Sequence, residues 1–501
     1  MKFRVKAAVR LCIFINLLTL HAGLRAQAIA PRILYTDLDS GPNSGGQGNL
    51  GAFVSIYGQG FGSESSSASI TFGGGAAQII SWTNTKIIAQ LGSSSSSGSI
   101  VVNTSTGVSN PVEFKVRSGN IYFVATTGND SSDGSFLNPW LTLLKASRAI
   151  VAGDIVYVRN GVAQKTDDGE GWRSCLTIGA KSGTAAQPIA LVAYPNETAT
   201  IGDIDGCESG IRSKGQEEHF WTIAGFQLRG KDEALTTYGV TGWRIIGNDM
   251  TCPKGNGASA CYETSLSTYL KVYGNNVHDS GASNASALYH GVYFSTDSNH
   301  IDFGWNTIAN IRGCRGLQIH SSPLTGGGQN DQTGHDQFDL KIHDNFIHDT
   351  QCDGIILATV DPSKGSVEVF NNVIMNTGKG PNNPERSGSW SCIHVQGYTN
   401  SGPPGSGTIH VYNNVLYGCG TFANPPYKGG NAAIFMSGPN ASKRLQLVGN
   451  IVVLVNAIPY ISAEDGNDQD CDNCSRVYGS SNLFFGSGVR PKPSARPLFV
   501  F

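Results

Sequence analysis

The sequence predicts an all-β protein of 501 residues, most of it built from short strands that stack as repeated units. Glycine is abundant at 64 residues, and Asn, Ser and Thr recur between apolar stretches, which suits turn-rich β-structure. Apolar and polar residues alternate at period 2, as in strands. Residues 340–377 hold one full period, from IHDNFI through DGIILAT to VFNNVI. Because so short a unit cannot bury its own apolar face, the units must stack.

Residues 1–28 are predicted to be a secretory signal peptide. Basic residues mark the first ten positions, and the apolar stretch LCIFINLLTL that follows is short for a membrane span. The stretch AGLRAQA has the small residues of a cleavage region, and a retained membrane anchor is the alternative. We therefore expect a secreted or cell-surface protein, extracellular or periplasmic, with no membrane span once the signal is removed.

Composition restricts the partners. The formal net charge is −2 and charged residues make up 14%, so there is no basic excess of the kind that binds nucleic acid. We also expect the protein to be a monomer. Ten cysteines remain outside the signal, an even number that suggests disulfides in an exported protein, with the pairing left open. Cys471 and Cys474 form a CxxC, but no second CxxC completes a zinc site.

Residues 30–117 form a first module of short alternating strands separated by Gly, Ser and Asn turns. That pattern is typical of a small sandwich. The pieces IYGQGFG and ITFGG are fairly specific, and on them the module resembles the IPT/TIG immunoglobulin-like domain. The resemblance implies a spacer or binding module rather than a catalyst.

Residues 120–501 are predicted to form the stacked part. A strand and a polar loop are followed by a short helix in LTLLKASRAI and then by another strand. This opening resembles that of secreted right-handed parallel β-helices of the pectate-lyase type, in which the helix caps the end of the stack. A cap is needed because an open end exposes apolar rungs and unpaired strand edges. The chain ends at SARPLFVF, where a further rung is expected.

One element of the repeat carries an asparagine in constant register, as in KIHDNFI and EVFNNVI. Asparagine tolerates a left-handed backbone, and its amide can bond the equivalent residue one rung above and below. This predicts a ladder of stacked asparagines at a tight turn. The aligned residues are Asn248, Asn275, Asn306, Asn345, Asn372, Asn414 and Asn450.

A second element, the glycine-led strand of HGVYFST, RGLQIHS and DGIILAT, fixes which side chains share a face. Alternation sends pairs such as Ile355 and Leu357 inward and stacks the other residues outward at roughly 4.8 Å. The outward columns collect residues suited to chemistry. We predict catalytic roles for His320, His394, Arg315, His290 and Tyr293, and substrate-binding roles for Gln318, Asp353, Gln396, Phe435, Lys379 and Arg386.

The residue types indicate a reaction. Histidine titrates near neutrality and serves as base or acid, and arginine grips a carboxylate. Cleavage of a uronate by β-elimination needs the sugar carboxylate neutralised, for which Arg315 is suited, and a base such as His320 or His394. Tyr293 or His290 is then the acid, and the rings of Tyr293 and Phe435 can stack on sugars. No metal-ligand set stands out. The cofactor is left open. Calcium is one option, although no residues match the calcium-binding aspartate cluster of the resembled family.

The leading prediction is therefore a polysaccharide lyase acting on an extracellular acidic glycan. A non-catalytic carbohydrate-binding or adhesin-like surface protein is the alternative. A glycoside hydrolase comes third, because the two carboxyl groups it needs are poorly supplied by Asp353 and Asp297. Asp331, Asp336 and Glu385 lie in inserted loops near them. Lyase action leaves an unsaturated sugar that absorbs in the ultraviolet, hydrolysis leaves reducing ends without that absorbance, and an adhesin leaves neither.

Overall fold

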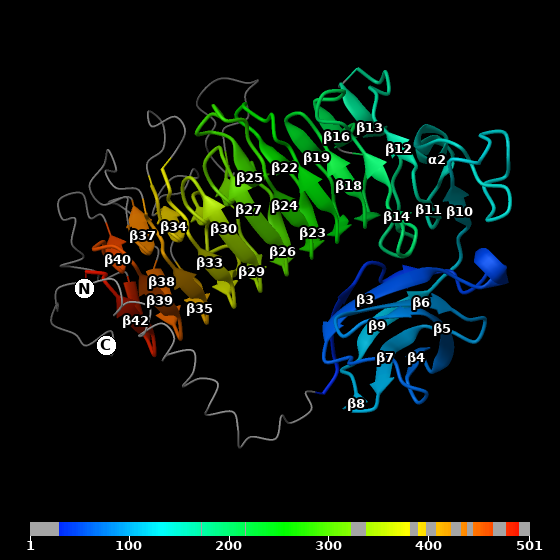
Figure 1. Cartoon of the computed structure of the whole chain (residues 1–501), viewed down its shortest axis with the longest axis horizontal. Coiled ribbons are helices and arrows are strands. Elements are labelled where there is room, and N and C mark those ends of the chain that lie inside the picture. The colour runs from blue at the N-terminus through cyan, green and yellow to red at the C-terminus, as the bar shows by residue number, and fades with distance from the viewer. Residues whose placement is uncertain are drawn as a thin grey trace, which may run out of the picture.

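A computed structural model describes residues 30–171, 173–215, 217–321, 337–380, 389–396, 407–421, 432–437, 444–463 and 477–489. It shows two parts, a small sandwich and a long stack of parallel strands (Figure 1). The predicted signal peptide, Arg386 and the Cys471–Cys474 pair lie outside these residues. No helix among the described segments has the length and apolarity needed to cross a membrane.

The sandwich strands pair mainly antiparallel in the order β1-β3-β6-β5-β4-β7-β9-β2, with β8 beside β7. Their bounds are β1 Arg32–Thr36, β2 Ser40–Gly41, β3 Phe53–Gln59, β4 Ser69–Phe72, β5 Gly75–Trp82, β6 Lys86–Leu91, β7 Gly98–Thr104, β8 Gly107–Val108 and β9 Val112–Val116, with a 3-10 turn η1 at Gln47–Asn49. This is the all-β module predicted before residue 117.

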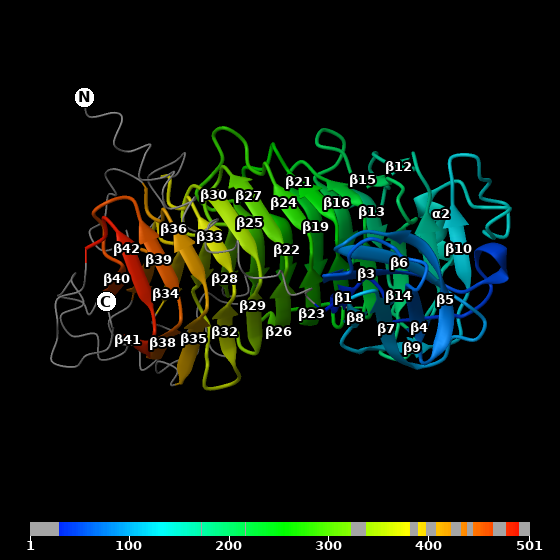
Figure 2. The ribbon, with the colours of Figure 1, turned by 60° about the horizontal axis from the view of Figure 1, so that its bottom comes forward.

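The stack consists of three parallel sheets, each of which takes one strand from every rung (Figures 1 and 2). The twelve-stranded sheet contains β10 Ile121–Val124, β11 Ile155–Val158, β14 Ile189–Ala193, β17 Trp221–Ala224, β20 Arg244–Ile246, β23 Thr268–Tyr273, β26 Asn299–Gly304, β29 Leu340–His343, β32 Val367–Phe370, β35 Thr408–Tyr412, β38 Arg444–Val448 and β41 Val477–Ser480. The eleven-stranded sheet contains β12 Ala163–Gln164, β15 Thr200–Ile201, β18 Gln227–Arg229, β21 Asp249–Thr251, β24 Asn276–His278, β27 Thr307–Ile311, β30 Phe346–Thr350, β33 Val373–Met375, β36 Val415–Tyr417, β39 Ile451–Leu454 and β42 Leu483–Gly486. The ten-stranded sheet contains β13 Ser174–Ile178, β16 Ser209–Ser213, β19 Glu233–Tyr238, β22 Ala260–Ser265, β25 His290–Ser295, β28 Leu317–His320, β31 Ile355–Leu357, β34 Ile393–Gln396, β37 Ile434–Ser437 and β40 Ile461–Ala463.

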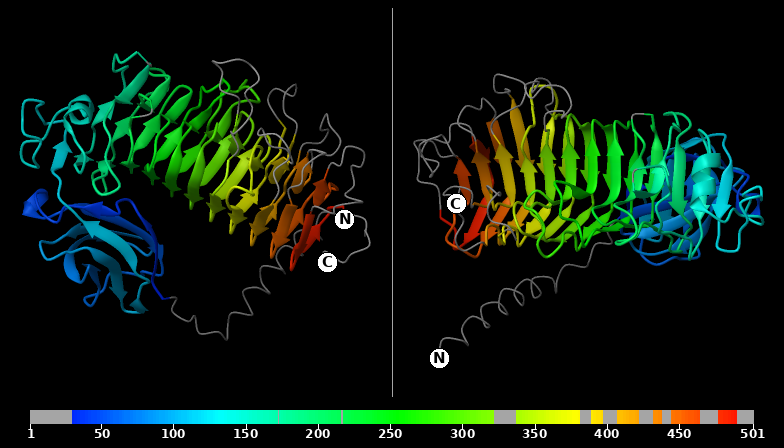
Figure 3. Two further views of the ribbon diagram at one scale, coloured as in Figure 1. Left: turned by 180° about the vertical axis from the view of Figure 1, so that it is seen from behind. Right: turned by 90° about the horizontal axis from the view of Figure 1, so that it is seen from above.

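A short helix, α2 at Leu143–Ala149, covers the N-terminal end of the stack, as predicted (Figure 3). The hydroxyl of Thr142 caps it by accepting a hydrogen bond from the Lys145 backbone N–H at 3.1 Å. Leu143 and Ala146 are buried in the same apolar core as the first rungs. The helix therefore shields rung residues that would otherwise face water.

The predicted asparagine ladder is present, between the twelve-stranded and the eleven-stranded sheets. Asn345 shows the pattern: its side-chain oxygen accepts from the backbone and the amide of Asn306, at 2.9 and 3.0 Å. Its own amide donates to Asn372 at 2.9 Å and to the Phe303 carbonyl at 3.0 Å. The ladder runs one residue further than predicted, to Asn482, which accepts from Asn450.

The left-handed backbone of the ladder is not on the asparagines themselves, as we had predicted, but on the residue before each one. Asp344 has φ 52° and Trp305 has φ 57°, and Gly247 and Gly274 hold the same conformation at other rungs. The asparagine follows directly with an extended backbone because it opens the next strand, and this frees its amide to bond along the stack.

Replacing Asn345 by alanine is expected to cost about 3 kcal/mol or more of unfolding free energy. The substitution leaves two donors of Asn306 buried without their acceptor and removes one bond each to Asn372 Oδ1 and the Phe303 carbonyl. Each buried group left without a partner costs about 1–3 kcal/mol. Denaturant unfolding of the two variants measures this, with the exposed Asn138→Ala as the matched control. Equal stability of both variants would show that the ladder contributes nothing.

The sandwich packs against the first half of the twelve-stranded sheet. Its apolar core continues into outward-facing residues of that sheet, including Phe123, Tyr157 and Tyr273. Tyr157 Oη donates to the Phe53 carbonyl at 2.8 Å, and Arg244 Nη2 donates to the Thr36 carbonyl at 2.6 Å. The ten-stranded sheet, which carries most of the predicted site residues, takes no part in these contacts.

Candidate functional site

The ten-stranded sheet brings the predicted residues side by side in the expected register. Tyr293 pairs with Gln318, and Ser295 pairs with His320, on β25 and β28. On the next two strands Ile356 pairs with His394. The alternate residues, such as Ile355 and Leu357, lie in the apolar core as predicted, so the polar columns face outward.

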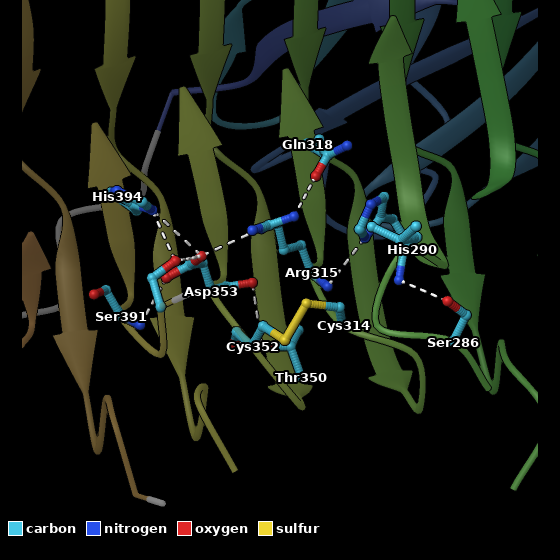
Figure 4. The surroundings of a disulfide bond; sticks show 12 residues. Ser286, His290, Cys314, Arg315, Gln318, Thr350, Cys352, Asp353, Ser391 and His394 are labelled. Atoms are coloured by element: carbon cyan, nitrogen blue, oxygen red, sulfur yellow. Dashed lines mark hydrogen bonds and ion pairs between the residues drawn. A yellow bond between two sulfur atoms is a disulfide. The ribbon is translucent and has the colours of Figure 1, made fainter. Parts of the chain in front are cut away.

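Asp353 joins two of the predicted residues (Figure 4). Arg315 Nε lies 3.4 Å from Asp353 Oδ2, and His394 Nδ1 lies 3.6 Å from the same oxygen. The hydroxyl of Ser389 contacts both the Asp353 carboxylate and His394 Nδ1, and the Ser391 backbone N–H donates to Asp353 Oδ1 at 2.8 Å. Asp353 is therefore a hub that positions Arg315 and His394, rather than only a turn residue.

The Asp353 carboxyl is fully buried. Burial acts to raise its pKa, but hydrogen bonding and charge attraction from His394, followed by the charge of Arg315, outweigh it and hold the pKa below its usual value. The carboxylate thus stays ionised and keeps its two partners in place at neutral pH.

A disulfide lies directly beside the Arg315–Asp353 pair in the sequence. Cys314 and Cys352 are bonded, and each directly precedes one member of the Arg315–Asp353 pair (Figure 4). The other three disulfides, Cys175–Cys207, Cys252–Cys261 and Cys392–Cys419, also lie within the stack, which confirms the expectation of disulfides. The crosslink therefore restrains the backbone of adjacent rungs at the point where the ion pair begins.

Two neutral histidines and a tyrosine form the second half of the cluster. Tyr293 Oη lies 3.2 Å from His320 Nδ1, and the His290 ring meets the Tyr293 ring edge-on with centroids 5.8 Å apart. Burial, followed by the charge of Arg315, lowers the pKa of His320 to about 4, and burial lowers the pKa of His290 well below its usual value. Both imidazoles are therefore uncharged at neutral pH.

Arg315 connects the two halves. Its backbone N–H lies 3.4 Å from His290 Nδ1, and its Nη1 donates to Gln318 Oε1 at 2.6 Å. The side chain of Arg315 is 14% exposed, whereas those of Asp353 and His394 are 0% and 4% exposed. The cluster is thus more enclosed than the open sheet face we had predicted, and Arg315 is the charged group with access to the outside.

The remaining predicted residues lie apart from this cluster or at its edge. Phe435 is buried and packs on His394 with ring centroids 4.7 Å apart, and Gln396 is half-buried on the same strand as His394. Lys379 pairs with Asp349, on β30 of the eleven-stranded sheet, rather than with the cluster. Their roles in binding substrate remain predictions.

Sequence reasoning missed two carboxyl groups on the same sheet. Glu233 and Glu263 lie on β19 and β22, and Glu263 pairs directly with Tyr293. Burial, with a smaller contribution from Glu233, raises the pKa of Glu263 to about 7. These strands begin EALTTY and ACYETS instead of with the glycine that marks the later rungs, so the glycine pattern passed over them. Counting one and two rungs back from HGVYFST would have found Glu263 and Glu233.

Among the described residues, no metal-binding set adds to the cluster, and the pocket described below lies elsewhere on the stack. Within the described segments, no three or more His, Cys, Asp or Glu side chains are placed to hold a metal ion. A pocket of about 230 Å³ lies at the start of the ten-stranded sheet, lined by residues that include Arg148, Lys181, Lys214 and Thr177. Thr177 is five strands from Gln318, about 24 Å along the sheet, so this pocket is separate from the cluster.

Family models of known proteins match segments in both parts of the chain. The family model of the Pel9A-like, right-handed β-helix region matches residues 122–300, and that of the IPT/TIG domain matches residues 39–116. Similar solved structures include pectate lyase Pel9A, with 14% identity, coverage of 76% of this chain and 79% of that chain, and a TM-score of 0.45. An alginate lyase from Paenibacillus sp. str. FPU-7 has 14% identity, coverage of 70% and 96%, and a TM-score of 0.39. A comparison with curated proteins finds no match.

Sequence, fold and family models agree on the architecture. The repeat predicted stacked strands, the structure shows three parallel sheets, and the family match covers the first rungs of that stack. The stack thus contains a Pel9A-like right-handed β-helix region over residues 122–300, and the sandwich contains an IPT/TIG domain over residues 39–116.

Proposed function

We propose that this protein cleaves an acidic, uronate-containing polysaccharide by β-elimination on the ten-stranded sheet. One observation carries the proposal: Tyr293 Oη and an uncharged His320 lie 3.2 Å apart, next to an arginine whose position is fixed. A base, a proton donor and a carboxylate-binding cation are the three groups that this reaction needs. The match of residues 122–300 to the Pel9A-like right-handed β-helix model supports the fold on which this site is placed.

The roles follow from the geometry. Arg315 binds the uronate carboxylate and stabilises the charge that develops when the α proton leaves. His320 takes that proton, and a C=C bond forms as the bond to the leaving oxygen breaks. Tyr293, which lies beside His320, gives its proton to the leaving oxygen, and the phenolate recovers a proton from water or His320. Gln318 and Asp353 hold the guanidinium through Nη1 and Nε, which leaves Nη2 toward the substrate.

Secretion fits this function, and its support is the set of disulfides. Four disulfides suit an oxidising compartment outside the cytoplasm, where polysaccharides of this kind are found. The signal peptide over residues 1–28 and the monomeric state are part of the proposal.

A second function, carbohydrate binding without cleavage, is favoured by one observation. His290 and Asp353 are almost fully buried, at 1% and 0% exposed, and buried polar networks often serve to hold a fold together. In that case the cluster would stabilise the stacked strands, and the protein would bind glycan without changing it.

Incubation of the purified protein with a panel of acidic polysaccharides, followed at the ultraviolet band of unsaturated uronates, tests the proposal. We expect absorbance to rise with polyuronates. Because His320 acts as a base only when neutral and its pKa is about 4, the rate should hold down to about pH 5 and fall as the pH drops through 4. Reducing ends without absorbance would replace the lyase by a hydrolase, and binding without either product would favour the second function.

A further inference from the structure

A single serine joins the two glutamates on the ten-stranded sheet. Ser259 Oγ lies 3.0 Å from Glu233 Oε1 and 2.9 Å from Glu263 Oε2, so these two oxygens are no more than about 6 Å apart. Glu233 also accepts from the hydroxyl of Ser209. Two carboxyl groups thus meet at one hydroxyl.

The number of protons in this arrangement decides its charge. A serine hydroxyl has one proton and can donate to only one acceptor at a time. The second contact is a hydrogen bond only if the other carboxyl group is protonated and donates to the serine oxygen. Ser209 already donates to Glu233. If Glu263 holds the proton, it donates to Ser259, and Ser259 in turn donates to Glu233, so every contact is a hydrogen bond. The raised pKa of Glu263 agrees with this direction.

An unpaired hydroxyl beside Glu263 points to a ligand. Thr236 and Glu263 are paired neighbours on β19 and β22 in the outward column, which also contains Arg212 on β16. Thr236 is 8% exposed, and its Oγ1 has no hydrogen-bond partner within the described residues. A buried donor without a partner costs about 1–3 kcal/mol, so it is expected where a ligand completes the bond.

We propose that Arg212, Thr236 and protonated Glu263 form a second subsite that binds the carboxylate of another uronate ring of the same glycan. Thr236 supplies a hydroxyl donor, Arg212 supplies positive charge, and protonated Glu263 is neutral, so the three together suit an acceptor-only group such as a carboxylate. The subsite is two strands from Gln318, about 10 Å along the sheet, so it holds a ring other than the one that is cleaved. This inference rests on the proposed function, because it assumes the same acidic substrate.

The subsite should lose affinity at alkaline pH. The groups that face Glu263 are Glu233, Arg212, Tyr293 and His290, and His290 stays uncharged over the range tested because its pKa lies well below its usual value. When Glu263 ionises, its negative charge repels the carboxylate of the ligand. If only the protonated form binds, a pKa of about 7 predicts an affinity about 30-fold lower at pH 8.5 than at pH 6.

Calorimetric titration with a tetra-uronate and a mono-uronate at pH 6 and pH 8.5 tests the inference. For the tetramer we expect the 30-fold loss in the natural protein and almost none in Glu263→Gln, whose amide stays neutral and can donate to Ser259 at both pH values. The exposed Glu217→Gln should behave as the natural protein. Thr236→Val should weaken tetramer binding about 3- to 10-fold at pH 6, the value of one hydrogen bond, without changing mono-uronate binding.

Two results would overturn the subsite. The first is tetramer affinity that does not depend on pH, or that depends on it equally in Glu263→Gln; because binding itself is then intact, the proposed function survives. The second is an infrared spectrum of the unliganded protein at pH 6 with no carboxylic-acid band that disappears in Glu263→Gln, which needs no ligand. Absence of tetramer binding at pH 6 would overturn the subsite and the acidic substrate together.

Discussion

Replacing His320 by alanine is expected to lower the rate of uronate cleavage by about 10²–10⁴-fold, the usual contribution of a general base. The imidazole is uncharged at neutral pH and lies 3.2 Å from the Tyr293 hydroxyl, so the proposed base lies next to the proposed proton donor. Initial rates at the ultraviolet band of the unsaturated product measure the loss. Binding of an uncleaved oligo-uronate should change little, because His320 does not hold the substrate carboxylate.

Two further variants sharpen this result. Tyr293→Phe removes only the hydroxyl and should reduce the rate to a similar extent while keeping the ring contact with His290. His410→Ala changes a histidine on the twelve-stranded sheet that bonds Gln446, and it should retain full activity. If His320→Ala cleaves at the natural rate, the reaction takes place elsewhere on the molecule.

Replacing Asp353 by alanine is expected to destabilise the protein by about 3–5 kcal/mol, since removal of one partner from a buried ion pair leaves the other without compensation. Arg315 loses the contact at Nε, while Ser389, Ser391 and His394 lose their shared acceptor. Urea unfolding measures the change. As the pKa of Asp353 is lowered in the folded state, its stabilisation is present above its unfolded pKa of about 4 and is lost as pH falls through the folded value.

Asp205 supplies the matched comparison. It also pairs with a cation, Lys254, but its side chain is 67% exposed, and such pairs contribute about 0–1 kcal/mol. Asp205→Ala should therefore unfold at nearly the urea concentration of the natural protein. If Asp353→Ala does the same, the carboxylate is not the hub that the geometry indicates, and Arg315 is held by other contacts.

The fold could be predicted because the repeat is a local signal. The repeated asparagine and the glycine of the strands HGVYFST, RGLQIHS and DGIILAT set the register, and the register alone places Ile355 inward and Tyr293 beside Gln318. A one-residue error would have reversed every face, so agreement of several rungs left little freedom. The error about the left-handed residue arose because the turn pattern gives its position only to within one residue.

The site was predictable as a set of neighbours but not as a network. The central role of Asp353 depends on Ser389 and on the Cys314–Cys352 bond, and cysteine pairing cannot be read from spacing. The burial of the cluster and the sharing of one serine by Glu233 and Glu263 depend on side-chain directions across rungs that lack the glycine signal. Such contacts are non-local, and no periodicity encodes them.

The shared core of the sandwich and the stack affects how the molecule can be divided. Phe123, Tyr157 and Tyr273 belong to the stack by sequence, yet they complete the interior of the IPT/TIG domain. The segment near residue 118 therefore joins two parts that share one packed interior. Contacts of the domain with the twelve-stranded sheet stabilise the early rungs, which also carry the residues of the proposed second subsite.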